Sequence, residues 1–179
     1  MTDPVHGRLA AAAAIVDGLR GLGFTPVLVG GMALVILGSR RVTRDFDFLI
    51  AAPGERLPDV VALFYDRGFE LVSRLDDAGN VTATIDNRRV ASIRIRADQP
   101  ASVYFFNRAT RLRIDLLFDF PLPAQAVAKA AVDMKILGHV FAVASAEDLL
   151  RLKEIARAAR SFAGDAQDIE FLKSRLERS

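Results

Sequence analysis

The 179-residue chain has no cysteine and no tryptophan, and it has only two histidines, His6 and His139. Without cysteine neither a disulfide nor a thiolate metal site can form, and two imidazoles argue against a histidine-rich zinc site. The longest apolar run, residues 27–38, falls well short of the ~20 residues of a membrane span, and the run 10–16 is too short for a secretory signal. We therefore expect a cytoplasmic protein without membrane contacts.

The net charge of the chain is also small. The formal net charge is +2, although the sequence pI is about 9.3. A weakly basic chain does not indicate a dedicated nucleic-acid binder. Apolar residues make up 51% of the chain, enough to form a folded core, and the length suits one domain or one domain with a small appendage.

Apolar periodicity predicts a mixed α/β part followed by a mostly helical end. Up to residue 120 the expected elements are helices at 4–22, 31–38 and 58–68, and strands at 25–29, 45–50, 69–73, 80–86, 89–96, 102–106 and 111–118, with Asn87-Arg88 as a hairpin turn. Pro121-Leu-Pro123 is the expected boundary between a core at 1–120 and a small C-terminal subdomain at 121–179. That subdomain is expected to hold a short helix, two small strands at 131–136 and 139–143, and two helices that begin at Ser145 and near Asp165.

Two aspartates at positions i and i+2 of a predicted strand are the clearest candidates for a metal site. Asp45 and Asp47 share one face of the strand, about 6.6 Å apart along it, and carboxylate oxygens are the ligands that Mg²⁺ prefers. A third carboxylate must come from another strand. Asp115 is the preferred candidate, and Asp119, about 13 Å further along, is the alternative. A simpler interpretation makes Asp115 a solvated edge-strand residue paired with Arg113.

A glycine pair precedes these aspartates at an expected strand-to-helix turn, where backbone N–H groups can hold phosphate. The stretch Gly30-Gly-Met-Ala-Leu…Gly38-Ser-Arg-Arg-Val-Thr-Arg-Asp-Phe-Asp47 resembles the G-G-x-A-L…G-x-x-R-x-T-x-D-x-D signature of the polymerase-β-like nucleotidyltransferase superfamily. It is most similar to small bacterial members: AbiEii-type toxins, minimal nucleotidyltransferases and lincosamide nucleotidyltransferases. The resemblance implies an α/β (α+β) nucleotidyltransferase fold, a small mixed β-sheet packed against helices, with a helical C-terminal appendage.

The resemblance also implies a role for each residue of the motif. Two Mg²⁺ ions, or Mn²⁺, would bind Asp45 and Asp47, and Asp115 would complete the metal site and act as base. The triphosphate would be held by the two glycines and flanked by two residues of the loop, which are Gly30, Gly31, Thr43 and Arg44. The arginines of the loop, Arg40, Arg41 and Arg44, are alternatively an ordinary solvated group.

Further along the chain, Lys153 lies beside the apolar stripe of its predicted helix. It could reach a triphosphate as a point charge, or it could cover apolar surface with its stem. Asp165 and Asp168 are expected to cap the last helix.

The implied activity is transfer of a nucleoside monophosphate from a nucleoside triphosphate, ATP being the expected one, to an acceptor hydroxyl. The acceptor could be a small molecule, an RNA or a protein. Two alternatives are a toxin that modifies RNA and has an antitoxin partner, and a catalytically silent binding module.

Overall fold

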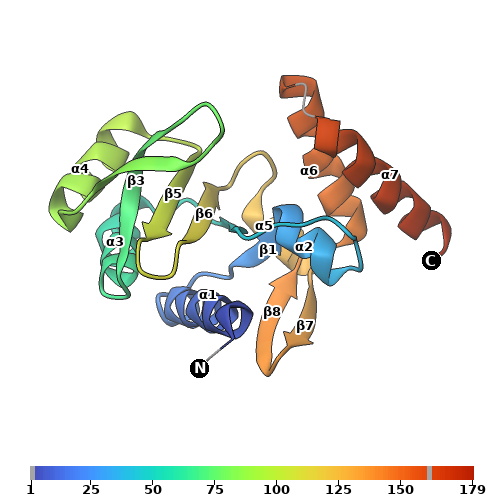
Figure 1. Ribbon diagram of the computed structural model, residues 1–179, viewed down its shortest axis with the longest axis horizontal. Coiled ribbons are helices and arrows are strands. Elements are labelled where there is room, and N and C mark those ends of the chain that lie inside the picture. Colours follow the sequence, from blue (N-terminus) through green and yellow to red (C-terminus); the bar gives the residue numbers. More distant parts are fainter. Residues whose placement is uncertain (1–2, 161–162) are drawn as a thin grey trace.

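The computed structural model describes residues 3–160 and 163–179, which form one eight-stranded sheet with helices packed around it (Figure 1). The described helices are α1 (Pro4–Gly21), α2 (Gly30–Ile36), α3 (Leu57–Tyr65), α4 (Arg88–Asp98), α5 (Ala124–Ala130), α6 (Ala146–Ala159) and α7 (Ala163–Glu177), with a 3₁₀ turn η1 (Gly54–Arg56). The strands are β1 (Val27–Val29), β2 (Phe46–Ile50), β3 (Phe69–Leu75), β4 (Val81–Ile85), β5 (Ser102–Asn107), β6 (Leu112–Phe118), β7 (Val132–Ile136) and β8 (His139–Val143).

The sheet is mixed, with the strand order β4-β3-β5-β6-β2-β1-β8-β7. β2 runs parallel to β6, β1 runs parallel to β8, and the other neighbouring pairs are antiparallel. The expected mixed sheet packed against helices is therefore confirmed. β7 and β8, the two small strands predicted after residue 121, extend this same sheet beside β1. The division into a core at 1–120 and a subdomain at 121–179 stays a prediction.

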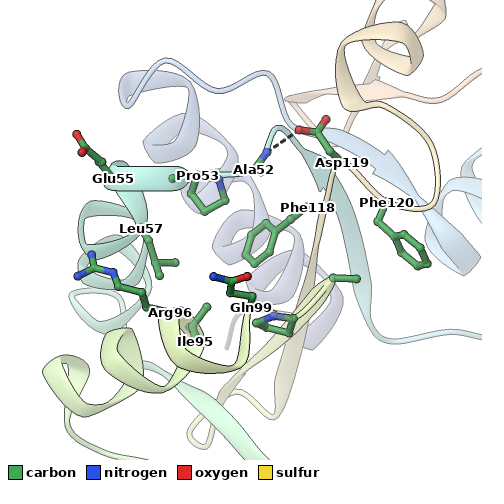
Figure 2. A pocket seen from close by; sticks show the side chains of 13 residues that line it. Ala52, Pro53, Glu55, Leu57, Ile95, Arg96, Gln99, Phe118, Asp119 and Phe120 are labelled. Atoms are coloured by element: carbon green, nitrogen blue, oxygen red, sulfur yellow. Dashed lines mark hydrogen bonds between the residues drawn. The ribbon is translucent and has the colours of Figure 1, made fainter.

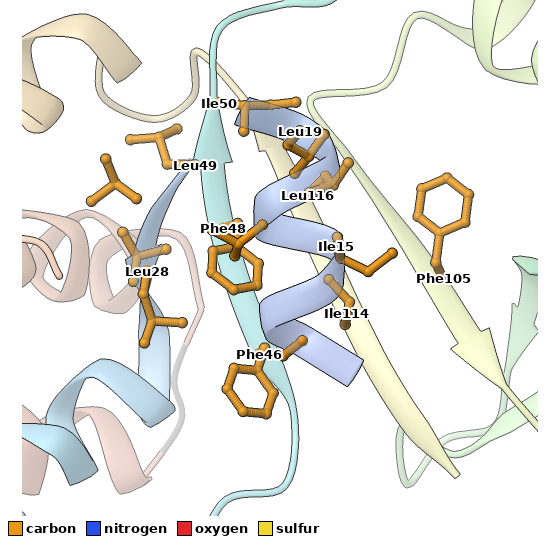
Figure 3. Close-up of a cluster of buried hydrophobic side chains, with 14 of the residues drawn as sticks. Ile15, Leu19, Leu28, Phe46, Phe48, Leu49, Ile50, Phe105, Ile114 and Leu116 are labelled. Atoms are coloured by element: carbon orange, nitrogen blue, oxygen red, sulfur yellow. The ribbon is translucent and has the colours of Figure 1, made fainter. Parts of the chain in front are cut away.

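Helix α1 packs on the face of the sheet that carries large apolar side chains (Figure 3). Its Ile15 is fully buried, as are Phe48 of β2 and Ile114 of β6. Because successive side chains of a strand point to opposite faces, Asp47 and Asp115 are directed to the face that α1 leaves uncovered. The core therefore holds β2 and β6 from one side and leaves both aspartates on the other.

One predicted element is wrong. Residues 89–96, expected to be a strand after a hairpin turn, belong to helix α4. The alternation Ile93-Arg-Ile-Arg96 suggested a strand, but Ala91 and Ile95, one helical turn apart, are the buried residues of the segment. Asn87 caps the helix, since its side chain accepts hydrogen bonds from the N–H groups of Arg89 and Val90.

The C-terminal helices α6 and α7 pack against each other as a helical pair (Figure 1). Ser145 caps α6, as predicted, by accepting a hydrogen bond from the Asp148 N–H at 3.1 Å. Helix α7 begins at Ala163, so Asp165 lies inside its first turn and is not the capping residue. Among the described helices, none is long and apolar enough to cross a membrane.

Candidate active site

Asp47 and Asp115 lie side by side on the face of the sheet opposite helix α1. Parallel β2 and β6 pair these two residues directly, and Asp45, which directly precedes β2, belongs to the same face by alternation. Asp115 is 5% exposed and Asp47 is half-buried. The structure therefore pairs Asp47 with Asp115, and Asp45 lies near this pair through its contact with Arg113.

The carboxyl groups of Asp47 and Asp115 lie close enough for each to change the pKa of the other. Burial raises the pKa of Asp115 to about 8; the negative charge of Asp47 adds to this rise, and Arg113 opposes it. Burial also raises the pKa of Asp47, although the charges of Arg113 and Lys153 act in the opposite direction. Two buried carboxylates this close cannot both ionise without a compensating cation.

Arg113 supplies positive charge to this acidic face. Its Nε and Nη2 donate to the two carboxylate oxygens of Asp115 at 2.9 and 3.0 Å, and Nη2 lies 3.5 Å from Asp45 Oδ2. The pairing of Arg113 with Asp115 was the simpler sequence interpretation, and the pairing exists. The location differs, because β6 is an interior strand and Asp115 is buried.

The Gly30-Gly31 turn lies against the carboxylates. β1 pairs Val29 with Asp47, so Gly30 follows directly beside Asp47. Gly30 has φ +68°, and a Cβ placed there would come 2.3 Å from Asp47 Oδ2. Only glycine fits at this position, both for its backbone conformation and for the space it leaves to the carboxylate. The turn and the acidic pair therefore form one continuous site.

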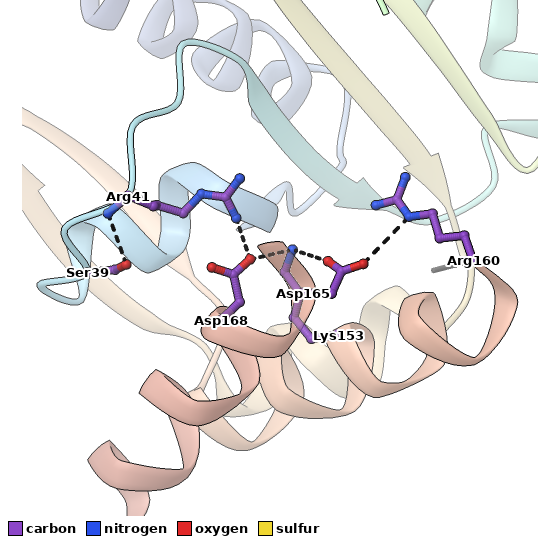
Figure 4. A network of polar contacts seen from close by, with 6 residues as sticks. All are labelled: Ser39, Arg41, Lys153, Arg160, Asp165 and Asp168. Atoms are coloured by element: carbon purple, nitrogen blue, oxygen red, sulfur yellow. Dashed lines mark hydrogen bonds and ion pairs between the residues drawn. The ribbon is translucent and has the colours of Figure 1, made fainter. Parts of the chain in front are cut away.

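A second charged group connects the loop after α2 with α6 and α7 (Figure 4). Lys153 of α6 lies 3.2 Å from Asp165 Oδ1 and 2.9 Å from Asp168 Oδ2, and both aspartates of α7 are buried. Asp168 also accepts a hydrogen bond from Arg41. Asp165 lies in the first turn of α7 and Asp168 lies further along the helix, so neither is its N-cap residue. Both side chains pair with Lys153 instead.

Arg41 connects this charged group to the glycine turn. Its guanidinium lies against Gly31, where an added Cβ would come 3.0 Å from Arg41 Cζ. In the described part of the chain, Arg41 Nε is buried and has no hydrogen-bond acceptor. Lys153 is near enough to Asp47 to lower the pKa of that carboxyl by its charge. Arg41 therefore places one cation beside the glycine turn, and Lys153 places a second within electrostatic reach of Asp47.

In the loop between α2 and β2, the arginine that lies against the glycine turn is not Arg44, which the sequence favoured. Arg44 is exposed and Thr43 is half-buried, and neither side chain makes a hydrogen bond or ion pair with another described residue. Sequence reasoning favoured Arg44 because it adjoins Asp45, whereas the loop conformation turns Arg41 toward Gly31. The only signal for Arg41 was its place in the motif, as the arginine of G-x-x-R-x-T.

Asp119 lies away from the acidic pair, at the far ends of β2 and β6. Its oxygens accept hydrogen bonds from the N–H groups of Ala52 and Ala124, at 2.8 and 2.9 Å. It borders a cavity of about 1030 Å³ whose lining includes Phe118 and Phe120 (Figure 2). Asp119 therefore fixes two chain segments, and Asp115 is the aspartate that lies beside Asp47.

No protein-family profile matches the chain, and no curated protein matches it either. The similarities are to solved structures. Over 92% of this chain and 96% of the other, it resembles the lincosamide antibiotic adenylyltransferase LnuA in its lincomycin-bound form, with a TM-score of 0.56 and 15% identity. The solution structure of the antibiotic-resistance factor ANT(2'')-Ia gives a TM-score of 0.58 at 12% identity, over 96% of this chain and 85% of the other.

A putative nucleotidyltransferase from Thermotoga maritima, TM1012, matches all of this chain and 97% of its own length, with a TM-score of 0.54 and 13% identity. These likenesses extend over nearly the whole chain and concern its fold. The chain therefore has the nucleotidyltransferase fold that its sequence motif led us to expect.

Proposed function

We propose that the protein is a metal-dependent nucleotidyltransferase that moves a nucleoside monophosphate from a nucleoside triphosphate, ATP being the expected one, to an acceptor hydroxyl. One observation carries the proposal: the register of β1, β2 and β6 places Gly30, Asp47 and Asp115 in contact. The turn where a phosphate could come close to the backbone therefore lies next to the two carboxylates.

The acidic residues suit a divalent cation by their donor chemistry. Asp45, Asp47 and Asp115 offer carboxylate oxygens, which Mg²⁺ and Mn²⁺ prefer, and the raised pKa values of Asp47 and Asp115 are those of carboxyl groups that lack a cation between them. As arranged, the described residues include no set of three acidic or imidazole side chains placed to hold an ion, and Arg113 takes both oxygens of Asp115. When bound, the ions would neutralise charge on the reacting phosphate and polarise it.

The cationic group would bind the triphosphate. Arg41 Nε, buried without an acceptor, could donate to a phosphate oxygen beside Gly31, and Lys153 would act there as a point charge. Gly30 would admit the phosphate chain close to the backbone. Thr43 and Arg44 keep the flanking role that the resemblance implies. The chain would thus hold the pyrophosphate leaving group on the β1 side of Asp47.

Asp115 would act as the base on the acceptor side. Its carboxylate, kept ionised by a neighbouring cation, could accept the proton of the acceptor hydroxyl while the hydroxyl oxygen attacks the α-phosphorus and pyrophosphate departs. Asp115 lies on β6, whereas the glycine turn follows β1. The acceptor hydroxyl and the triphosphate would therefore lie on opposite sides of Asp47.

The acceptor is the part of the proposal that comes from the structural relatives. LnuA was solved with lincomycin, and ANT(2'')-Ia was solved in complex with adenylyl-2''-tobramycin. A lincosamide and an aminoglycoside are therefore the first acceptors to test, followed by tRNA and total protein. The toxin with an antitoxin partner and the silent binding module stay predictions from the sequence.

The test is transfer of label from α-³²P nucleoside triphosphates in the presence of Mg²⁺ or Mn²⁺ and each acceptor. We expect transfer by the wild type, and loss of more than about 100-fold in Asp47→Asn, because electrostatic stabilisation of a transition state commonly accounts for such a factor. Asp133→Asn, an exposed aspartate on β7, is the matched control and should transfer like the wild type.

Binding of ATP measured by calorimetry separates the alternatives. If the wild type and Asp47→Asn bind ATP equally weakly and neither transfers label, the proposed activity is wrong. If ATP binds tightly but no acceptor is labelled, the binding module becomes the better account. Growth arrest on expression, together with labelled tRNA, would instead support the toxin.

A further inference from the structure

Arg113 makes more polar contacts on the acidic face than its pairing with Asp115 requires. Besides the two hydrogen bonds to Asp115 and the 3.5 Å contact with Asp45, its Nη1 donates to the Gly79 carbonyl at 3.3 Å. Its Cζ lies 5.1 Å from the centre of the Tyr104 ring. The guanidinium of Arg113 therefore contacts four parts of the chain: its own strand β6, Asp45 just before β2, strand β5, and the turn between β3 and β4.

These contacts divide into two groups. The contacts with Asp45 and Asp115 occupy carboxylate oxygens, which are the same atoms that a divalent cation would need. The contacts with Tyr104 and the Gly79 carbonyl use no carboxylate. A guanidinium that left the aspartates could therefore remain over Tyr104, held by the ring and by the backbone of the β3–β4 turn.

The guanidinium and a divalent ion cannot both hold the oxygens of Asp115. Arg113 already uses both of them, its side chain is only 21% exposed, and two cations within a few ångströms repel each other strongly where water is scarce. Metal binding at the acidic face therefore requires that Arg113 give up Asp115, or that the ion bind without Asp115.

We propose that Arg113 is the resident counter-ion of the carboxylates in the free protein, and that it exchanges with the divalent cation, releasing Asp45 and Asp115 while staying over Tyr104. This inference rests on the proposed function, because it takes the acidic face as the metal site. It makes Arg113 a positioning residue whose charge sets the affinity of the site for metal. It also connects metal entry to the β3–β4 turn through the Gly79 carbonyl.

The test is calorimetric titration with Mg²⁺ in the absence of nucleotide, at a pH above 8 so that a carboxyl proton does not mask the comparison. We expect Arg113→Gln, which removes the charge but keeps an amide donor, to bind Mg²⁺ about tenfold more tightly than the wild type, a factor typical of one lost competing ion pair. Arg113→Lys, which cannot hold two oxygens at once, should gain a smaller factor of about 3.

Arg108→Gln is the matched control. Arg108 is exposed, it donates to Thr84 Oγ1 at 2.8 Å and lies 3.7 Å from Glu70, away from the three aspartates. Its loss should leave the Mg²⁺ affinity within about twofold of the wild-type value. If Arg113→Gln does not fold, Arg113→Lys alone decides the question.

The outcomes separate this proposal from the proposed function. If the wild type binds Mg²⁺ and transfers label, but both Arg113 variants bind Mg²⁺ equally or more weakly, then Arg113 supports the site and does not compete for it, and the exchange is refuted. If neither the wild type nor any variant binds Mg²⁺, with or without ATP, both proposals are wrong. Tighter binding in the Arg113 variants alone supports the exchange.

Discussion

Asp47 and Asp115 are paired directly across two parallel strands, and the pKa of both carboxyl groups is raised. The arrangement is unfavourable for folding when both groups are ionised, because burial and mutual repulsion act together. Nothing in the hydrophobic core requires it, since α1 packs on the opposite face. A cation bound between the two groups would relieve this repulsion.

The first prediction concerns the pH dependence of stability. The folded-state pKa of Asp115 is about 8, above its ordinary value of 3.8, so the folded state binds more protons than the unfolded state between these values. The contribution of Asp115 to stability is therefore fully present below about pH 4 and is lost as the pH rises toward 8. Asp115→Asn should flatten this decline.

Chemical denaturation at pH 5 and at pH 8 provides the measurement. Between these two conditions the wild type should lose at least about 1 kcal/mol more unfolding free energy than Asp115→Asn. Asp133→Asn, on the exposed strand β7, should keep the wild-type slope. Equal slopes in all three proteins would show that Asp115 is not protonated in the folded state at intermediate pH.

The second prediction concerns Gly30. Gly30→Ala places a residue with a side chain at φ +68° and puts its Cβ 2.3 Å from Asp47 Oδ2. Gly54 has a similar φ of +54°, but a Cβ there meets nothing within 4 Å. Gly54→Ala should therefore cost about 1–2 kcal/mol, which is the backbone strain alone, and Gly30→Ala should cost at least about 1 kcal/mol more because Asp47 must move.

Thermal unfolding of the two glycine variants measures this difference, and Mg²⁺ binding supplies a second readout. Gly30→Ala should weaken Mg²⁺ binding because the Asp47 carboxylate is displaced, whereas Gly54→Ala should not. Equal destabilisation and equal Mg²⁺ affinity would mean that the Asp47 carboxylate adjusts without loss, and that the close approach of Gly30 has no role in the site.

Local sequence pattern was sufficient for the parts of the site that lie on one element. The alternation predicted a strand with Phe46, Phe48 and Ile50 on one face and Asp47 and Leu49 on the other, and β2 is this strand. The glycine turn was predicted by the same local means. Asp115 was harder to assign to the site from the sequence, because its position beside Asp47 depends on the pairing of two strands that are distant in the chain.

Contacts that depend on tertiary packing were not predictable from pattern. Arg41 and Arg44 lie on the same loop, whose residues have no periodicity, and only the loop conformation turns Arg41 toward Gly31. The sequence placed Lys153 beside an apolar stripe, but its partners come from the next helix, where Asp168 was expected to interact with its own helix end. The strand predicted at 89–96 failed because alternation over a few residues can also occur on an exposed helix.

The third prediction concerns the buried lysine. Lys153 is paired with Asp165 and Asp168, which are almost fully buried. Lys153→Gln leaves two buried carboxylates with less compensation, so it should lower the unfolding free energy by about 3 kcal/mol. Lys173→Gln is the control on the same helical pair: Lys173 and Glu154 are 3.9 Å apart and both half exposed, so the loss should stay below about 0.5 kcal/mol. Equal losses would show that the Lys153 pairs are not buried in solution.

The fourth prediction decides which arginine of the loop binds the triphosphate. Arg41→Gln should weaken ATP binding about tenfold, since it removes a charge-assisted donor beside Gly31. Arg40→Gln, an exposed neighbour, should change the Kd for ATP by less than about twofold. Circular dichroism must show that Arg41→Gln is folded, because the substitution also removes one partner of Asp168. If Arg44→Gln weakens ATP binding and Arg41→Gln does not, the triphosphate lies along the exposed side of the loop, as the sequence favoured, and Arg41 serves only to attach that loop to α7.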